Sequence, residues 1–226
     1  MNPTKNLPER SFIETHKQNE VWDLANSVLY KLCEEHPEHN KPEKILAKTW
    51  LIGRSYAVAL ERRKIKDKLN NDDFYSKEVV PNFQNSELDK KLRTLKEKHK
   101  LLTVEALMDS LEIHKYLTAL TCKFTEIEKR SFSSKYLHFH FPDLFFIYDS
   151  RAVAALGIFV KKIPKETSQF LTLADSKNVD KTYAEFACKC FYLLQEIEIQ
   201  RGIKLTIREL DTLFLKLANE KLKARK

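Results

Sequence analysis

The sequence predicts an all-α protein that forms a single compact domain of seven to nine helices. Apolar residues recur every three or four positions along most of the chain, which is the spacing of one buried helix face. No segment keeps the strict alternation of apolar and polar residues that a half-buried strand requires. Only three glycines occur in 226 residues, too few for the frequent tight turns of an all-β fold.

The first half of the chain divides at its prolines. We expect residues 1–10 to form a flexible arm and residues 11–226 to form the domain. Ser11 and Glu14 have capping-box spacing and predict the start of a helix that continues through Leu32. The stretch EHPEHNKP then separates two helices, because Pro42 suits the first position of the next one. That helix is expected to reach Leu60 and to end in the basic run ERRKIKDK.

The second half begins with a lysine-rich helix near Ser86, and Thr103 is expected to open a long helix. A short helix is predicted over residues 134–141, and Asp149 is predicted to cap a helix over residues 150–160. A further helix starts near residue 178 and closes at Gly202. The last helix has the clearest start, because residues 206 and 209 form a capping box and the leucines at 205 and 210 a hydrophobic staple.

The composition limits the functions that the chain can have. A formal charge of +8 and a pI of about 9.1 favour a nucleic-acid partner, DNA or RNA, although excess lysine also serves solubility. The dispersed glycines exclude a dinucleotide fingerprint and a P-loop. The start MNPTKNLPER lacks the apolar core of a signal peptide, and no run is long enough to span a membrane. We therefore expect a cytoplasmic protein with reduced cysteines and no membrane partner.

The stretch SSKYLHFHFPDLFFIYDSR, residues 133–151, has an ionisable residue near each end of an aromatic run. It resembles the core of the helix-hairpin-helix DNA glycosylase superfamily, which reads L-P-G-V-G-x-K, an apolar helix and then V-D-T-H. The segment SFSSK, residues 131–135, occupies the place of G-V-G-x-K, and IYDSR, residues 147–151, occupies the place of V-D-T-H. The stretch is also similar to that of uncharacterised bacterial proteins. Both hairpin glycines are serines here, and fourteen positions separate the lysine from the aspartate.

The resemblance implies a catalytic pair. Lys135 would attack the sugar carbon and form a Schiff base, and Asp149 would stabilise the cationic sugar or activate water. Ser131, Ser133, Ser134 and Arg151 would contact the DNA phosphates. The simpler interpretation makes Asp149 a helix N-cap and places Lys135 on an exposed helix face.

The aromatic residues allow two interpretations as well. Dense apolar side chains at mixed spacing are typical of a core. Tyr136 and Trp50 could instead stack on an extruded base. His138 and His140 are two residues apart on a helix, so at most one of them can face a site with Lys135.

Several other residues are candidates for surface contacts. Arg62 and Arg63, together with Lys161 and Lys162, could follow a phosphate backbone, or they could form an ordinary solvated surface. Arg54 is expected to pair with a carboxylate such as Asp149.

No metal or cofactor site is assigned. Cys33, His36 and His39 have the spacing of zinc ligands, but a fourth ligand is missing locally. No nucleophile elbow of the type G-x-S-x-G occurs, and no cofactor is implied.

Two functions remain, and the sequence leaves open whether the protein is an enzyme. The first is a basic, DNA-binding protein of the glycosylase type, active or degenerate. The second is a non-enzymatic interaction protein, such as a partner or toxin subunit in a bacterial defence or stress system.

Overall fold

The computed structural model describes residues 7–18, 20–62, 70–163 and 178–223, and this part of the chain contains helices and no β-strand. The all-α prediction is therefore confirmed for the described residues. The helices are α1 (Arg10–His16), α2 (Glu20–Glu35), α3 (Pro42–Ser55), α4 (Asn71–Phe74), the π-helical turn η1 (Tyr75–Val79), α5 (Val80–Gln84), α6 (Leu88–Lys98), α7 (Val104–Thr125), α8 (Arg130–His140), α9 (Ser150–Phe159), α11 (Lys181–Arg201) and α12 (Ile207–Lys223). Because α4, η1 and α5 are continuous, these segments make ten helical units, slightly more than the predicted seven to nine.

Most of the predicted helix signals act as expected. Thr103 caps α7 by accepting a hydrogen bond from the Ala106 amide, and Asp149 caps α9. The capping box before α12 forms in both directions, with 2.8 Å from the Thr206 amide to Glu209 Oε2 and 3.1 Å from the Glu209 amide to Thr206 Oγ1. Gly202 ends α11 in the left-handed conformation, at φ 65°.

Several helix boundaries differ from the predictions. The single helix expected from Ser11 through Leu32 is divided in two, because α1 ends at His16 and α2 begins at Glu20. The first helix starts at Arg10 with Glu9 as its N-cap, so Ser11 and Glu14 lie inside the helix and form no capping box. The helix α8 starts at Arg130, four residues earlier than predicted. Its early start is fixed by Arg130, whose Nε donates to both carboxylate oxygens of Asp180 at 2.8 and 2.7 Å.

The helix α3 ends five residues before Leu60. Ala57 takes a positive φ of 54°, which interrupts the helix, and the Val58 amide then donates to the Gly53 carbonyl at 2.8 Å. A Cβ on Gly53 would lie 3.1 Å from the Ala59 backbone, so this close return of the chain depends on glycine.

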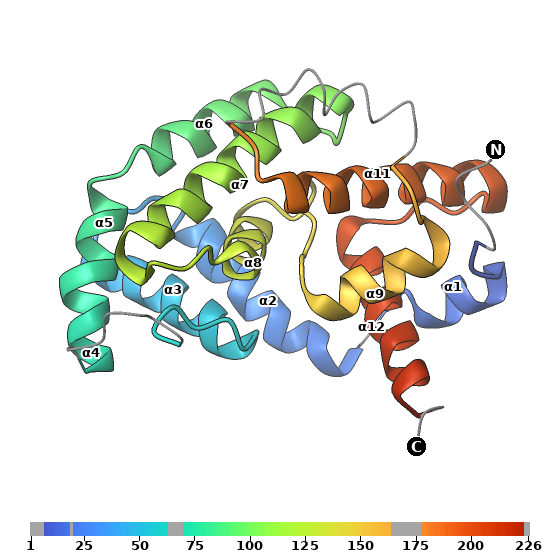
Figure 1. Ribbon diagram of the computed structural model, residues 1–226, viewed down its shortest axis with the longest axis horizontal. Helices are drawn as coiled ribbons and strands as arrows, with labels where there is room; N and C mark the ends of the chain where they lie inside the picture. Colours follow the sequence, from blue (N-terminus) through green and yellow to red (C-terminus); the bar gives the residue numbers. More distant parts are fainter. Residues whose placement is uncertain (1–6, 19, 63–69, 164–177, 224–226) are drawn as a thin grey trace.

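Two hydrophobic clusters share the long helix α7. One cluster combines the start of α7 with side chains of α1, α9, α11 and α12, and includes Leu107 and Leu111. The other combines the rest of α7 with α2, α3, the run α4–α5, α6 and α8, and includes Leu117 and Leu120. In Figure 1 the corresponding helices lie at the right and at the left of the view, with α7 and α8 between them.

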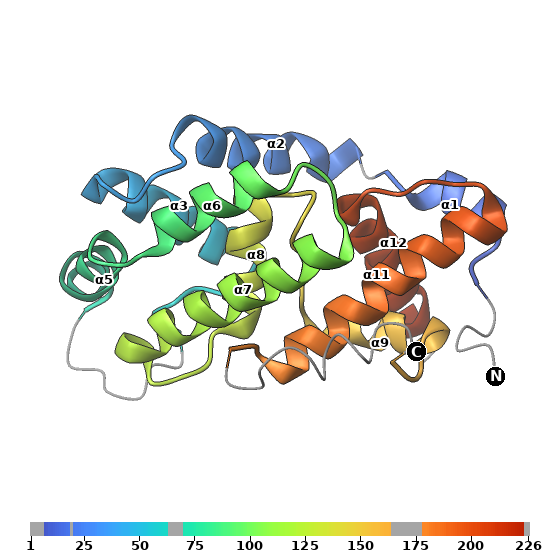
Figure 2. The same ribbon diagram turned by 90° about the horizontal axis from the view of Figure 1, so that it is seen from above.

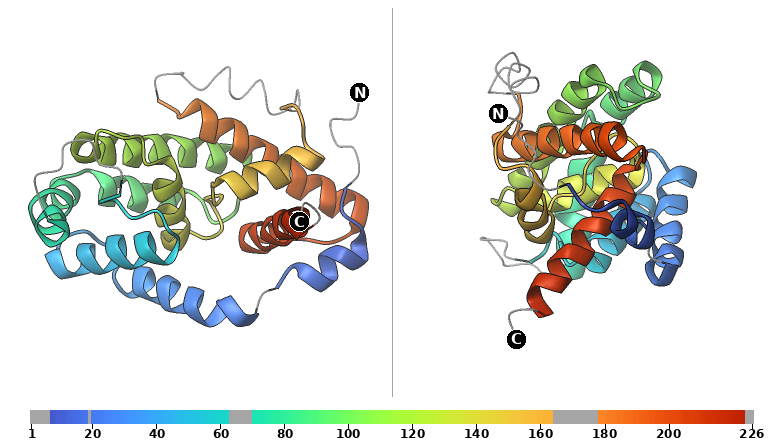
Figure 3. Two further views of the ribbon diagram at one scale, coloured as in Figure 1. Left: turned by 60° about the horizontal axis from the view of Figure 1, so that its bottom comes forward. Right: turned by 90° about the vertical axis from the view of Figure 1, so that its right-hand side faces the viewer.

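The helix α12 lies against α9 on one side of the molecule. Figure 2 and the left panel of Figure 3 both place α12 beside α9, and α2 runs along an outer edge of the same assembly. The helix α9, which packs on α12, begins at Asp149.

The predicted arm falls mostly on residues outside the described part. Of residues 7–10, Leu7 is buried in the first cluster and the Pro8 carbonyl accepts a hydrogen bond from Arg201 at 3.1 Å. None of the described helices is both long enough and apolar enough to cross a membrane.

Candidate functional site

Lys135 is a buried ammonium group with three hydrogen-bond acceptors. Its side chain is only 2% exposed. The Nζ atom donates to Ser131 Oγ at 3.0 Å, to the Tyr148 carbonyl at 3.0 Å and to Asp149 Oδ2 at 3.3 Å. Three acceptors match the three N–H bonds of an ammonium group, so the observed position suits the charged form. The sequence-based alternative of Lys135 on an exposed helix face is wrong.

The segment that connects α8 to α9 runs back along α8, and this arrangement places Asp149 next to Lys135. Ser134 Oγ accepts a hydrogen bond from the Tyr148 amide at 3.0 Å, and His138 Nδ1 donates to the Phe145 carbonyl at 2.8 Å. These bonds tie one face of α8 to the backbone of residues 145–148, because positions 134 and 138 are one helical turn apart. The thirteen residues between Lys135 and Asp149 thereby form a closed loop.

The Asp149 carboxylate caps the helix α9 with one oxygen and contacts Lys135 with the other. Its Oδ1 accepts hydrogen bonds from the Arg151 and Ala152 amides at 3.0 and 2.9 Å, and its Oδ2 faces Lys135. Burial raises the pKa of Asp149, but the Lys135 ammonium and the Ala152 amide outweigh burial and hold that pKa below its usual value. Asp149 is therefore a carboxylate near neutral pH, and at 21% side-chain exposure it is the member of the pair that reaches solvent.

The pKa of Lys135 is lowered by burial, and the neighbouring Asp149 and Asp211 carboxylates oppose that effect. The ring of Tyr56 lies 6.0 Å from Nζ and adds a weak cation–π contact. The site thus combines an amine whose proton is easier to remove than that of a surface lysine with a carboxylate beside it.

A polar network that sequence reasoning missed adjoins this pair. Arg208 Nη1 donates to Tyr56 Oη at 3.2 Å and to Asp211 Oδ2 at 3.0 Å, and Tyr56 donates to Asn26 Oδ1 at 2.7 Å. Nearby, Tyr30 donates to His138 Nε2 at 2.7 Å. These residues come from α2, α12, α8 and the turn after α3, so no local spacing in the sequence connects them.

The predicted phosphate-binding serines face inward. Ser131 is half-buried, and its Oγ donates to the Tyr148 carbonyl at 2.8 Å. Ser133 and Ser134 are fully buried. All three lie inside α8 and not in a turn that precedes it, so the helix-hairpin-helix turn expected at SFSS is replaced by helix.

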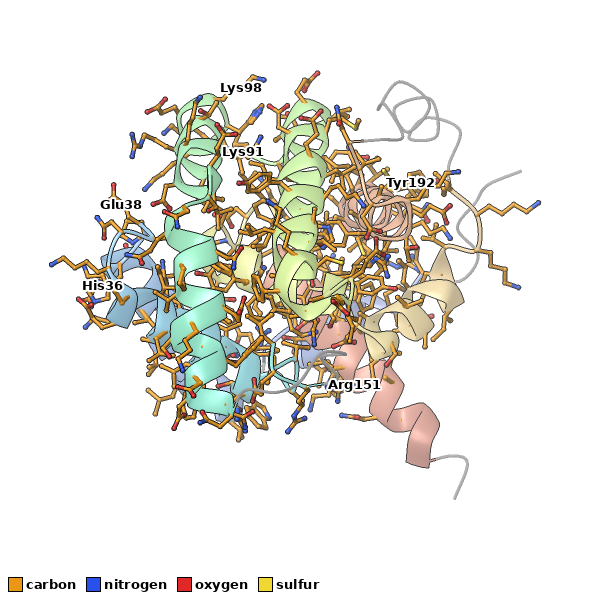
Figure 4. All side chains as sticks on the ribbon, turned by 60° about the vertical axis from the view of Figure 1, so that its left-hand side comes forward. His36, Glu38, Lys91, Lys98, Arg151 and Tyr192 are labelled. Atoms are coloured by element: carbon orange, nitrogen blue, oxygen red, sulfur yellow. The ribbon has the colours of Figure 1, made fainter. Side chains whose placement is uncertain are left out.

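The other predicted contact residues are distributed over the molecule. Arg151 and Arg62 are exposed, as are Lys161 and Lys162, and Arg63 lies outside the described residues. Figure 4 shows Arg151 at the start of α9, well separated in this view from His36 and Glu38 after α2. Arg151 is therefore the one described arginine of this set that lies beside the Lys135–Asp149 pair.

The two predicted stacking residues do not meet at Lys135. Tyr136 is fully buried, its hydroxyl bonds His39 Nε2 at 2.6 Å and its ring packs against Phe83 and Phe132. Trp50 is 43% exposed on α3, where the Arg54 guanidinium lies 5.7 Å from its ring. Arg54 forms an ion pair with a carboxylate, as expected, but its partner is Glu61 and not Asp149.

A cavity of about 770 Å³ opens away from the pair. The ends of α2, α6 and α8 and the start of α12 line it, and Arg208 connects it to the network around Tyr56. Neither Lys135 nor Asp149 belongs to its lining.

Within the described part of the chain, no three histidine, cysteine, aspartate or glutamate side chains are arranged to hold a metal ion. His39, one of the residues with zinc-ligand spacing, is instead hydrogen-bonded to Asp89 and Tyr136.

Comparison with known proteins adds no relative: no protein-family model, no curated protein and no solved structure matches this chain.

Proposed function

We propose that this protein binds DNA and that Lys135 and Asp149 form a centre that acts on the deoxyribose of a damaged nucleotide. The observation that carries the proposal is the 3.3 Å contact between a buried lysine amine and a carboxylate fourteen residues later in the chain. The resemblance of residues 130–155 to the helix-hairpin-helix glycosylases supports the assignment of roles, and the charge of +8 supports a polyanionic substrate.

The reaction uses the amine as a nucleophile. The neutral Nζ of Lys135 attacks C1′ of the sugar, the bond from C1′ to the base breaks, and the base leaves with the electron pair of that bond. The attacking nitrogen then loses a proton. The C1′–O4′ bond breaks as O4′ takes up a proton, which gives the protonated Schiff base, and the departed base takes up a proton from water. The Asp149 carboxylate stabilises the positive charge that develops on the sugar during bond breaking.

Access to the amine requires a local rearrangement. At 2% exposure Lys135 is covered, whereas Asp149 and the exposed Arg151 face solvent at the start of α9. The exposed guanidinium group of Arg151 at this helix start suits a DNA phosphate. The proposal therefore includes release of Nζ from the Tyr148 carbonyl and Ser131 when DNA is bound.

Borohydride trapping tests this function. Incubation with DNA that contains an abasic site and sodium borohydride should give a covalent complex with the wild-type chain and none with Lys135→Ala. Lys90→Ala, which removes an exposed lysine on α6, is the matched control and should trap as wild type does. Failure of the wild-type chain to trap, or an undiminished adduct with Lys135→Ala, would overturn the proposed reaction.

A second candidate function, protein interaction, is favoured by an apolar stripe on α2. Val21, Leu24 and Val28 are 85%, 76% and 57% exposed and lie on one face of the helix. The variant Leu24→Ser/Val28→Ser removes most of this surface and should lower self-association or dye binding without affecting borohydride trapping. Equal behaviour of the variant and the wild type would remove the support for an interface on α2.

A further inference from the structure

Asp211 is a buried carboxylate with an unused acceptor. It lies on α12 at 5% side-chain exposure, and its Oδ2 accepts from Arg208 Nη1 at 3.0 Å. Its Oδ1 is buried and accepts no hydrogen bond from the described residues. A buried charge with one satisfied oxygen costs stability, so its position calls for a functional explanation.

The location of Asp211 connects it to the candidate site. The helix α12 packs on α9, which begins at Asp149 (Figure 1). Arg208 also donates to the hydroxyl of Tyr56, whose ring faces the Lys135 amine. Asp211 is thus joined to Lys135 through Arg208 and Tyr56, and its negative charge acts on the amine through a buried, weakly screened region.

We propose that Asp211 is a positioning residue for Lys135: its buried negative charge keeps the amine in the ammonium form that bonds Ser131, Tyr148 and Asp149. This inference rests on the proposed role of Lys135 as a nucleophile. It assigns the resting charge state of that nucleophile to a residue outside the stretch that resembles the glycosylases.

Asp149 cannot play this regulating part by itself. Its Oδ1 is committed to the two amides at the start of α9, which favours the ionised form and helps to hold the pKa of Asp149 below its usual value. Burial raises the pKa of Asp211 to about 6, so its charge changes within the physiological range. Neutralisation of Asp211 withdraws one of the two negative charges that stabilise the Lys135 ammonium.

Several charged or titratable groups lie around Lys135 and Asp211 and affect the pKa values of these two residues. The pKa of Lys135 is raised by the charges of Asp149 and Asp211 and lowered by the charge of Arg151. The pKa of Asp211 is raised by the charge of Asp149 and lowered by the charges of Arg208, Lys135 and Arg151. The remaining groups are Tyr30, Tyr56, His138 and Cys190.

NMR titration of Lys135 tests the inference without any DNA. In protein labelled with ¹³C at the lysine Cε, Lys135→Arg identifies the Lys135 signal, and its chemical shift reports protonation. In Asp211→Asn we expect the midpoint to move to lower pH by about 0.5 unit or more, which is at least a threefold larger fraction of neutral amine at a given pH. Asp211→Glu should keep most of the wild-type value, and Glu220→Gln, an exposed site on the same helix, should not move it.

An unmoved Lys135 midpoint in Asp211→Asn overturns the inference. If that variant does not fold, the wild-type chain gives the answer, since its Lys135 signal should show an extra inflection near the pH at which Asp211 titrates. Absence of that inflection also overturns the inference.

Borohydride trapping separates this inference from the proposed function. The rise of trapping with pH should begin at lower pH in Asp211→Asn than in wild type, whereas a purely structural loss lowers the yield equally at every pH. Trapping with an unmoved midpoint rejects only the role of Asp211, and a moved midpoint without any trapping rejects only the proposed reaction.

Discussion

His114 and His138 are fully buried, and burial lowers the pKa of His114 to about 4 and that of His138 to about 3. Both are neutral in the folded protein, where His114 stacks on Tyr183 at 3.6 Å and donates to the Arg130 carbonyl. In the unfolded chain each binds a proton below about pH 6.5. Because the unfolded state then binds more protons, stability should fall as the pH drops below 6.5, by about 2 kcal/mol for each histidine at pH 5.

Urea denaturation of the wild type and of His114→Gln at pH 7, 6 and 5 measures this effect. The variant should be less stable at pH 7 but should lose less stability between pH 7 and 5, because one titrating group is gone. Equal slopes of unfolding free energy against pH for the two proteins would show that His114 is not the neutral, buried group that its contacts indicate.

The effect of pH on stability has the opposite sign for Asp211. Because its pKa is raised in the folded protein, Asp211 adds stability as the pH falls through about 6.

Lys48 is a second fully buried lysine, and it closes the end of α2. Its Nζ donates to the His36 carbonyl at 2.7 Å and the Glu38 carbonyl at 3.1 Å, which follow the helix. Lys48→Met should destabilise the protein by about 1–3 kcal/mol, because these partly buried carbonyls lose their donor. Thermal or urea unfolding checks the value, with the exposed Lys41→Met as control. A variant as stable as wild type would contradict this capping role.

At the scale of the helices, short-range signals predicted the starts of α7, α9 and α12, because these caps join residues only two or three apart. The start of α8 was mispredicted for a long-range reason. Ser131, Ser133 and Ser134 suggested a turn, but Arg130 is held by Asp180 fifty residues later. The hydroxyls of Ser131 and Ser134 form hydrogen bonds inside the fold, and Ser133 is buried. The early end of α3 likewise depends on the close return of Ala59 to Gly53.

The two roles of Asp149 can be separated by substitution. Asp149→Asn keeps an oxygen that can accept from the Arg151 and Ala152 amides but removes the carboxylate that pairs with Lys135, so it should destabilise the protein by about 1–3 kcal/mol. Asp149→Ala removes the cap and leaves Lys135 without its partner, which should cost about 2–4 kcal/mol. Both should reduce borohydride trapping strongly. Full trapping by Asp149→Asn would limit Asp149 to its structural role.

At the scale of the whole molecule, the pair Lys135–Asp149 was predictable from one stretch, and its surroundings were not. Asn26, Tyr56, Arg208 and Asp211 meet only because α2, α3 and α12 pack around α8 and α9. None of these residues has a local pattern that marks it as polar and buried. The burial of Tyr136 follows from the same packing, which places it against His39 and Phe83.

The proposed DNA binding should depend on salt, because the chain carries a net charge of +8. Arg151→Glu should weaken binding and reduce the slope of log affinity against log salt by about 1–2, because one cation next to the candidate site becomes an anion. Fluorescence anisotropy with an abasic duplex at several salt concentrations measures both quantities. The variant Lys161→Glu/Lys162→Glu tests whether the contact surface extends to the end of α9, and an unchanged slope in both variants would place DNA elsewhere.

The most direct test of the central claim is mass spectrometry of the borohydride-reduced complex with abasic DNA, after digestion by protease and nuclease. The account predicts that the sugar remnant is attached to the peptide that contains Lys135, at the Nζ atom next to Asp149. Attachment to another lysine or to the N-terminal amine, with Lys135 unmodified, would contradict it.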